Sequence, residues 1–310
     1  MHACGHDVHM ASWVGAAALL SSMKDRRRGT LVFVGQPAEE TVTGANAMVK
    51  DGLFTRFPKP DLVLGLHDTN LIPAGRVGLV SGPASAASNA VDITFYGKSG
   101  HGAAPHRAID PIVMAARTVT ALQTLVSREN NPFDPAVVTV GTFRAGTKRI
   151  PDDAKLELTV RSYKPEVQKR LLAGIERVAK AQALSAGAPR EPSVVVLSEE
   201  ASEVVVNDPT LQRLSAPLKR ALGDAVGPLE PTSASEDFGV YGRVAGAPSV
   251  QLRIGASDPA EWAKAKEAGT LPPGPHNAAF ALVREPTIRS GVSALTLSAL
   301  ELLGKAREQG

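Results

Sequence analysis

The pattern of apolar and polar positions divides the chain into three stretches. In the first, apolar residues recur at helical spacing over residues 9–24, and a β-branched run follows at residues 30–35. A second helical stretch at 43–53 and a second apolar run at 62–66 repeat this alternation. Helices that alternate with short apolar strands are typical of a parallel sheet covered by helices. We therefore expect an α/β domain with a mainly parallel sheet here.

The middle stretch has a different pattern. Residues 89–96 alternate apolar and polar positions, which is typical of a strand with one face in solvent. Amphipathic helices are expected at 111–127 and 165–186, and further strands at 136–143, 155–160 and 193–197. The resulting order β-α-β-β-α-β predicts a ferredoxin-like α+β domain inserted into the first one.

The last stretch returns to the α/β pattern. It predicts a helix at 209–223, a strand at 248–254 and a long helix at 287–305. We therefore expect residues 1–87 and 200–310 to form the two parts of one α/β domain, with the insert at residues 88–199. Two domains agree with a chain of 310 residues.

Composition and charge exclude several classes of protein. The chain is 43% hydrophobic and 21% charged, which is ordinary for a globular protein. The net charge of +3 is spread along the chain without a basic block, and aromatic residues make up only 4%, so we expect no nucleic-acid partner. No apolar run approaches the roughly 18 residues of a membrane span. The single cysteine excludes an intramolecular disulfide and fits a cytoplasmic location.

Metal-capable side chains lie at the start of the chain and after the first two expected strands. Cys4 and His6 are two residues apart, so an extended backbone would point both to one side, where they could share a metal. The first strand is followed by Glu39 and Glu40, and the second ends at His67. Ligands gather at the carboxyl ends of parallel strands. Because adjacent side chains diverge, one of the two carboxylates can bind a metal while the other faces a bound water.

Each of these motifs also has a purely structural interpretation. A Cys-x-His pair is as often structural as metal-binding, and two adjacent carboxylates usually lie in a solvated loop. His101 lies in a glycine-rich segment that reads as a hairpin turn, and His276 lies in a Pro/Gly-rich loop. His9, in the first helical turn, is expected to cap the helix or to support a metal ligand.

Together the motifs favour a metal centre. One thiol, four histidines and two carboxylates exceed one tetrahedral site, so we expect two divalent ions. Zinc or manganese are the first choices, with cobalt or nickel as alternatives. A two-metal centre polarises a carbonyl and lowers the pKa of bound water to roughly 7, and a nearby carboxylate can then act as general base. This chemistry is that of an amide hydrolase.

Seven motifs occur in a recognisable order. They are MHACGHDVHMA, VGQPAEE, GLHD, GKSGHGAAPHRAIDPI, IPDDA, TSASEDF and PHNAAF. In these motifs the sequence resembles the amidohydrolase branch of the zinc-dependent aminoacylase and carboxypeptidase superfamily, which includes hippurate hydrolases and indole-acetyl-amino-acid hydrolases. The resemblance implies a metallopeptidase catalytic domain with an inserted lid that also dimerises. It also implies cleavage of N-acyl amino acids, Glu39 as general base and five metal ligands, Cys4, His6, Glu40, His67 and His276.

The resemblance also assigns residues of the insert. It implies a homodimer in which the lid places His101 into the partner's active site, where it polarises the scissile carbonyl. Arg161 matches a lid arginine that holds the substrate carboxylate. Relatives carry an asparagine shortly before the Ile150-Pro151 pair, and here it is absent. Lys148 or Arg149 is therefore expected to take over part of substrate binding.

Two alternative hypotheses remain open. Relatives have an Ala-x-Asp-x-Asp-Ala-Leu-Pro-like segment before the cysteine motif, whose aspartate would orient a ligand histidine, and none is found here. A second hypothesis is therefore a truncated, catalytically impaired chain that dimerises through the insert and binds metal weakly. A third is nucleophilic catalysis by Cys4 with His6 as base, which leaves Glu39, Glu40 and the other histidines unexplained.

Overall fold

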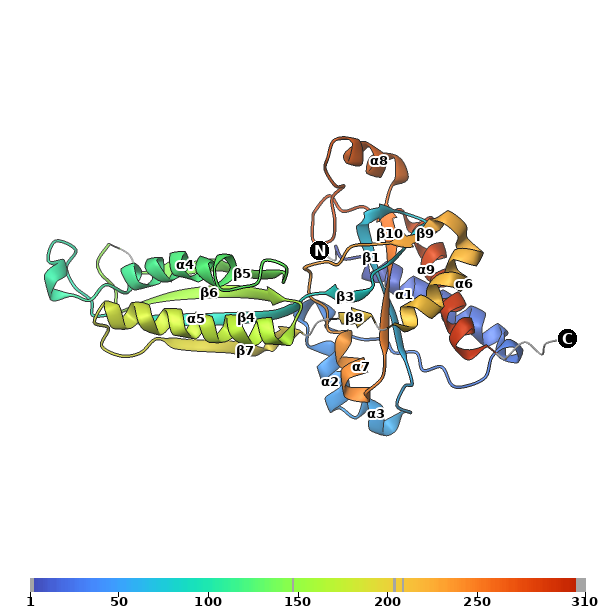
Figure 1. Ribbon diagram of the computed structural model, residues 1–310, viewed down its shortest axis with the longest axis horizontal. Coiled ribbons are helices and arrows are strands. Elements are labelled where there is room, and N and C mark those ends of the chain that lie inside the picture. Colours follow the sequence, from blue (N-terminus) through green and yellow to red (C-terminus); the bar gives the residue numbers. More distant parts are fainter. Residues whose placement is uncertain (1–2, 147, 203–204, 208, 305–310) are drawn as a thin grey trace.

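A computed structural model describes residues 3–146, 148–202, 205–207 and 209–304 of the chain. It contains a sheet covered by helices and an elongated second domain that projects from it (Figure 1). The fold class predicted from the sequence, an α/β domain with a mostly parallel sheet plus an inserted α+β domain, is confirmed. No helix among the described residues is both long and apolar enough to span a membrane.

The sheet of the α/β domain has four strands in the order β1-β10-β2-β9. β1 and β10 are parallel, β2 runs antiparallel to β10, and β2 and β9 are parallel. In this register His67 of β1 lies beside Arg253 of β10, at the level where the functional residues gather. The four strands are β1 (Val63–Pro73), β2 (Val77–Leu79), β9 (Val226–Pro228) and β10 (Ser249–Ser257).

Helices cover both faces of this sheet (Figure 1). On one face α6 and α9 enclose a core that includes Leu214, Leu218, Leu252 and Ala294, and α1 packs against α9. On the other face α2, α3 and α7 enclose a smaller cluster around Tyr241. The helices are α1 (His6–Ser22), α2 (Gly44–Lys50), α3 (Leu53–Arg56), α6 (Thr210–Leu222), α7 (Gly239–Ala245), α8 (Pro259–Glu267) and α9 (Arg284–Leu303). The predicted end of the last helix, Lys305, lies outside the described residues.

The second domain, called the lid below, is an antiparallel sheet in the order β5-β6-β4-β7 with two helices on one face. Its core includes Phe95, Leu122 and Leu156, all fully buried. The elements of the lid are β4 (Ala87–Tyr96), α4 (Pro111–Ser127), β5 (Ala136–Ala145), β6 (Asp153–Ser162), α5 (Pro165–Ser185) and β7 (Ser193–Ser202). The predicted domain boundaries at residues 88 and 199 fall within β4 and β7 and stay predictions.

Short elements connect these parts. A two-stranded sheet, β3 (Gly82–Ser85) with β8 (Val205–Asn207), lies between the two domains (Figure 1). Four single-turn 3-10 helices complete the described chain, namely η1 (Lys24–Arg26), η2 (Glu39–Thr41), η3 (Pro105–Arg107) and η4 (Gly223–Ala225).

The expected strand at residues 30–35 is wrong. This segment has no strand pairing among the described residues, and β1 pairs only with β10. Its β-branched side chains favour an extended backbone, but a strand also needs a neighbour for its N–H and C=O groups. Val32 and Phe33 stay 45% and 36% exposed, and the main aromatic contact is Phe33 edge-on against Trp13, with ring centroids 5.3 Å apart.

Candidate metal centre

The five predicted metal ligands meet in the α/β domain. Their ligand atoms form two groups, and within each group all atoms lie within 4.8 Å of one another. One group is Cys4, His6 and His67, and the other is Cys4, Glu40 and His276. Because Cys4 belongs to both, the arrangement suits two adjacent ions that share one thiolate.

Close contacts hold the members of each group together. Cys4 Sγ lies 3.7 Å from His67 Nε2, and His276 Nε2 lies 3.1 Å from a carboxylate oxygen of Glu40. The backbone N–H of His276 donates a hydrogen bond to the carbonyl of Ala3 at 2.6 Å, which ties the loop before α9 to the cysteine motif. Segments from both ends of the chain therefore build one site.

A glycine makes the turn between Cys4 and His6 possible. Gly5 has φ +70°, a left-handed conformation that glycine adopts without strain. A Cβ atom there would lie 2.4 Å from a carboxylate oxygen of Asp68. This backbone therefore passes directly over the Asp68 carboxylate and then starts α1, whose first residue is His6.

The turn that carries Glu39 and Glu40 is also constrained. Ala38 and Val42, on either side of η2, both have φ near +55°, which for a non-glycine residue costs roughly 1–3 kcal/mol. The buried carboxylate of Asp237 holds this region, because it accepts hydrogen bonds from Gln36 Nε2 at 2.6 Å and from the backbone N–H of Ala45 at 2.9 Å. Strain at such a turn is typical of functional sites.

The orientation of His67 is defined by its own neighbour. His67 Nδ1 lies 2.8 Å from the backbone carbonyl of Asp68, and a carbonyl can only accept, so Nδ1 carries the proton. The other nitrogen, Nε2, is then free to bind a metal and faces Cys4. Burial lowers the pKa of His67 to about 3, which keeps the ring in the neutral form that a metal requires.

The donor atoms fit divalent cations. His6 Nε2 is buried and has no hydrogen-bond partner, although carboxylate oxygens of Glu39 and Glu40 lie 3.3 and 3.6 Å away. Burial, and then the carboxylates of Glu40 and Asp68, raise the pKa of the Cys4 thiol above its usual range. A proton or a divalent cation between these groups would satisfy both the lone pairs and the negative charges. Thiolate, imidazole and carboxylate together are a donor set for zinc and similar ions.

Glu39 occupies a different position from Glu40. Its carboxylate lies within 4.8 Å of His6 and Glu40, but it also belongs to a group with those of Glu236 and Asp237, which Glu40 does not join. Burial, and then the charges of Glu236, Glu40 and Asp237, raise the pKa of Glu39 to about 8. A carboxylate whose pKa lies near neutrality suits a general base.

Four buried charged residues of this region, Asp68, Glu236, Asp237 and Arg253, were not given a role by sequence reasoning. Glu236 accepts hydrogen bonds from Gln251 Nε2 at 2.8 Å and from the backbone N–H of Phe238 at 3.1 Å. Arg253 is 7% exposed, and the negative charges around it are those of Glu236, Asp68, Cys4 and Glu39. An acidic pair in the TSASEDF motif and an arginine within the apolar run of β10 were the available signals.

Two of the three predicted lid residues lie away from this cluster within one chain. His101 and Lys148 are exposed and lie in the loops that follow β4 and β5, at the end of the lid far from the α/β domain (Figure 1). A backbone bridge between Gly100 and Ile150 joins the two loops, which we call the lid tip (residues 97–110 and 148–152). Arg161 lies at the opposite end of β6, and its Nη1 is buried without a hydrogen-bond partner.

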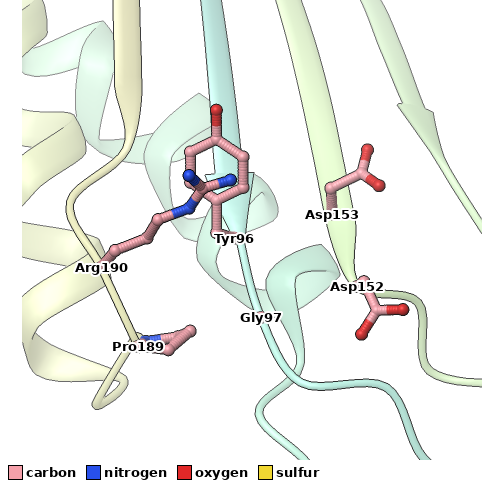
Figure 2. Close-up of a pocket in the computed structure, with 6 residues that line it drawn as sticks. All are labelled: Tyr96, Gly97, Asp152, Asp153, Pro189 and Arg190. Carbon is pink, nitrogen blue, oxygen red and sulfur yellow. The ribbon is translucent and has the colours of Figure 1, made fainter.

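A cavity of about 380 Å³ lies beside the lid tip and contains none of the predicted site residues. Figure 2 shows the guanidinium of Arg190 stacked over the ring of Tyr96, with Asp152 and Asp153 on the other side. The guanidinium carbon lies 3.4 Å from the centre of the Tyr96 ring. This cavity is separate from the metal-ligand cluster, which carries the candidate chemistry.

The sequence has clear relatives. It is 37% identical over 248 residues to an N-acetyl-L-cysteine deacetylase of Bacillus subtilis, covering 78% of this chain and 57% of that protein. It is 36% identical to the IAA-amino acid hydrolase ILR1-like 4 of Arabidopsis thaliana, covering 78% of this chain and 55% of the relative. The chain therefore spans little more than half the length of these curated relatives.

A solved structure has the same fold. The YXEP protein of Bacillus subtilis, described as a dinuclear metal-binding peptidase from the M20 family, matches with a TM-score of 0.77 and 28% identity. The match covers 98% of this chain and 73% of that one. The model of the peptidase family M20/M25/M40 matches residues 1–269. By this match and by the two ligand groups that share Cys4, the chain belongs to peptidase family M20/M25/M40.

Proposed function

We propose that this chain is a metal-dependent amidohydrolase that cleaves the amide bond of N-acyl amino acids, including hippurate-like compounds. The observation that carries the proposal is the pair of ligand groups sharing Cys4, with Glu39 beside them but outside both. The names of the relatives, an N-acetylcysteine deacetylase and an IAA-amino acid hydrolase, support the same substrate class.

Glu39 is assigned the proton transfers. Two divalent ions held by Cys4, His6, His67, Glu40 and His276 would polarise the amide carbonyl and acidify a water molecule. The Glu39 carboxylate accepts a proton from the attacking water and returns it to the leaving nitrogen, so that amide and water become a carboxylic acid and an amine. Cations nearby would lower the pKa of Glu39 from about 8, because positive charge favours the carboxylate.

The lid residues are assigned to substrate recognition across a homodimer. Arg161 has an unpartnered buried nitrogen that can donate to the substrate carboxylate. His101 and Lys148 lie together at the lid tip, and Arg161 lies at the other end of β6. We therefore propose that His101 and Lys148, or its neighbour Arg149, reach the active site of the partner subunit, while Arg161 acts in its own.

The direct test is turnover by the metal-loaded protein. We expect release of the free amino acid from hippurate, N-acetyl amino acids and indole-acetyl amino acids with zinc or manganese bound. A matched amide that lacks the carboxylate should react far more slowly. A protein that holds two ions and cleaves none of these compounds would contradict the proposal, and turnover that survives a strong chelator would contradict metal dependence.

One observation favours a second candidate function, an impaired chain that binds metal with little turnover. Residues 30–35 lead directly into the Glu39 turn and lack strand pairing among the described residues. Weakly held metal, a non-cooperative melting transition and little turnover would support it, whereas two tightly held ions and a cooperative transition would contradict it. Catalysis by the Cys4 thiol is not favoured, because burial and neighbouring carboxylates raise its pKa and keep it protonated without a metal.

A further inference from the structure

We infer that Asp68 is a positioning residue of the metal centre, which fixes the ligand His67 and the loop of Cys4 and His6. This inference rests on the proposed metal-dependent function. Asp68 follows His67 directly in β1, and its side chain is fully buried. It is a member of neither group that shares Cys4, but its carboxylate, His9 and His67 form a further group whose ligand-capable atoms lie within 4.8 Å of one another.

Three groups of Asp68 contact two histidines. Its carbonyl accepts from His67 Nδ1 at 2.8 Å, and its carboxylate oxygen Oδ1 lies 3.5 Å from the same nitrogen. Its backbone N–H and Oδ1 lie 2.9 and 2.7 Å from His9 Nε2. A contact of 2.7 Å between a ring nitrogen and a carboxyl oxygen requires one proton between them. Asp68 thus binds His9 and leaves Nε2 of His67 directed at Cys4.

His9 extends this support to the second histidine ligand. Its ring lies edge-on to that of His67, with centroids 4.5 Å apart, and its centroid is 5.4 Å from that of His6. His9 therefore packs between the two expected metal ligands His6 and His67, and Asp68 fixes the position of the His9 ring.

The Asp68 carboxylate also lies against the backbone that carries Cys4 and His6. A Cβ on Gly5 would approach Asp68 Oδ1 to 2.4 Å, so the backbone between Cys4 and His6 rests on this group. The second oxygen, Oδ2, is buried and has no hydrogen-bond partner. The buried guanidinium of Arg253 attracts the carboxylate and is part of its surroundings. Carboxylates in contact with ligand histidines typically change metal affinity 10–100-fold.

The test compares Asp68→Asn with Thr287→Val. Thr287 is an equally buried polar residue whose hydroxyl donates to the carbonyls of Gly255 and Val283, so its loss controls for general destabilisation. Cobalt binding is measured by competition with a chelator, together with the cobalt–thiolate absorption bands. We expect Asp68→Asn to weaken the binding of one of the two cobalt ions about 10–100-fold and to shift the absorption bands. Thr287→Val should change neither the cobalt affinities nor the bands.

The outcomes separate this inference from the proposed function. If the parent protein holds two ions and Asp68→Asn holds both equally tightly with unchanged bands, the role of Asp68 is overturned. A parent that holds no cobalt overturns the proposed function itself. If Asp68→Asn does not fold, His9→Gln replaces it, because the His9 side chain keeps 18% exposure. That variant should weaken one ion by about threefold or more, and unchanged binding would again overturn the inference.

Discussion

The metal-ligand cluster and the lid tip both contain histidines, yet the surroundings of these histidines are opposite. In the cluster, His67 is neutral and half-buried, its Nε2 lies 3.7 Å from Cys4 Sγ, and its other ring nitrogen is already hydrogen-bonded. At the lid tip, His101 is exposed, and its Nδ1 accepts a hydrogen bond from the backbone N–H of Ala103 at 3.1 Å. The fold of one chain brings the residues of the metal-ligand cluster together. The lid tip, in contrast, lies far from that cluster in the same chain (Figure 1).

The two domains differ in the same way in their interiors. The lid core consists of apolar side chains between two helices and a sheet, and regular packing alone explains it. The α/β domain buries Asp68, Glu236, Asp237 and Arg253 near the cluster, although buried charges are expensive. Such departures from an apolar core are expected where function requires them.

The largest expected effect is at Glu39. Glu39→Gln keeps the shape of the side chain but removes the base, so kcat should fall by about 10³-fold while both ions stay bound. Turnover and metal content are measured on the same sample. Glu285→Gln, at an exposed glutamate paired with Arg289 in α9, is the control and should keep full activity. Near-normal turnover by Glu39→Gln would contradict the assignment of Glu39 as the general base.

The next effect tests whether Cys4 is shared. Cys4→Ser should weaken the binding of both ions by about 100-fold or more, because the thiolate belongs to both ligand groups. Loss of a metal ligand should lower affinity at least as much as loss of a residue that supports a ligand. His276→Ala should weaken only one. Equilibrium dialysis with metal analysis measures the ratio of metal to protein. Loss of a single ion in Cys4→Ser would show two separate sites instead of a shared centre.

Local signals made Cys4, His6 and His67 candidates but left structural interpretations open, and the family resemblance supplied the full set of five expected ligands. The expected position of His67 at the end of a strand is wrong, because β1 continues to Pro73, yet the fold brings the five side chains together. Residues 30–35 were wrongly predicted to form a strand. Strand formation depends on a neighbouring strand to pair with, and the residues of the segment itself do not show whether such a neighbour is present.

Buried charges were the second gap. Asp68 and Arg253 come together only through the register of β1 with β10, which places residue 67 beside residue 253 across 186 positions of sequence. Asp237 acts on Gln36 and Ala45, about 200 residues away. Local periodicity carries no signal of such distances, so these residues read as ordinary surface acids or as interruptions of a strand.

A third prediction tests the isolation of the lid tip. His101→Ala should lower kcat by about 10–100-fold without loss of metal. If His101 serves the partner subunit, mixing equal amounts of His101→Ala and Glu39→Gln subunits under exchange conditions should restore about a quarter of parental activity, since half of the dimers then contain one intact site. Mixing each inactive variant with itself is the control. Mixtures that stay inactive despite verified exchange would place His101 in its own subunit.

A smaller effect separates the two cationic lid residues. Arg161→Met should raise KM for N-acyl amino acids by about 10–100-fold, because a charge-assisted hydrogen bond from a partly buried donor is lost. Lys148→Met should raise KM by less than about tenfold, since an exposed ammonium binds more weakly. An amide substrate without a carboxylate is the control, and its kinetics should be insensitive to both changes. Equal sensitivity of both substrates would contradict carboxylate recognition.

The smallest expected effect is on the stability of the metal-free protein, and it depends on pH. Unfolded Glu39 ionises near 4.5, whereas burial and neighbouring carboxylates raise its pKa to about 8 in the fold. The native state therefore holds the extra proton between these values, and stability falls as pH rises from 4.5 to 8. Glu39→Gln abolishes this loss, so its advantage in unfolding free energy should be absent below pH 4.5 and reach the order of 2 kcal/mol above pH 8.

Melting curves of both proteins across this pH range measure that difference. The lowered pKa values of His9 and His67 give the opposite slope, with stability lost as pH falls from about 6.5 towards 3, but both proteins share it and it cancels. Bound cations favour the ionised carboxylate, so the advantage of Glu39→Gln should shrink when metal is added. A difference that does not change with pH would mean that Glu39 is solvated like the lid tip, and the contrast between the two regions would fail at this residue.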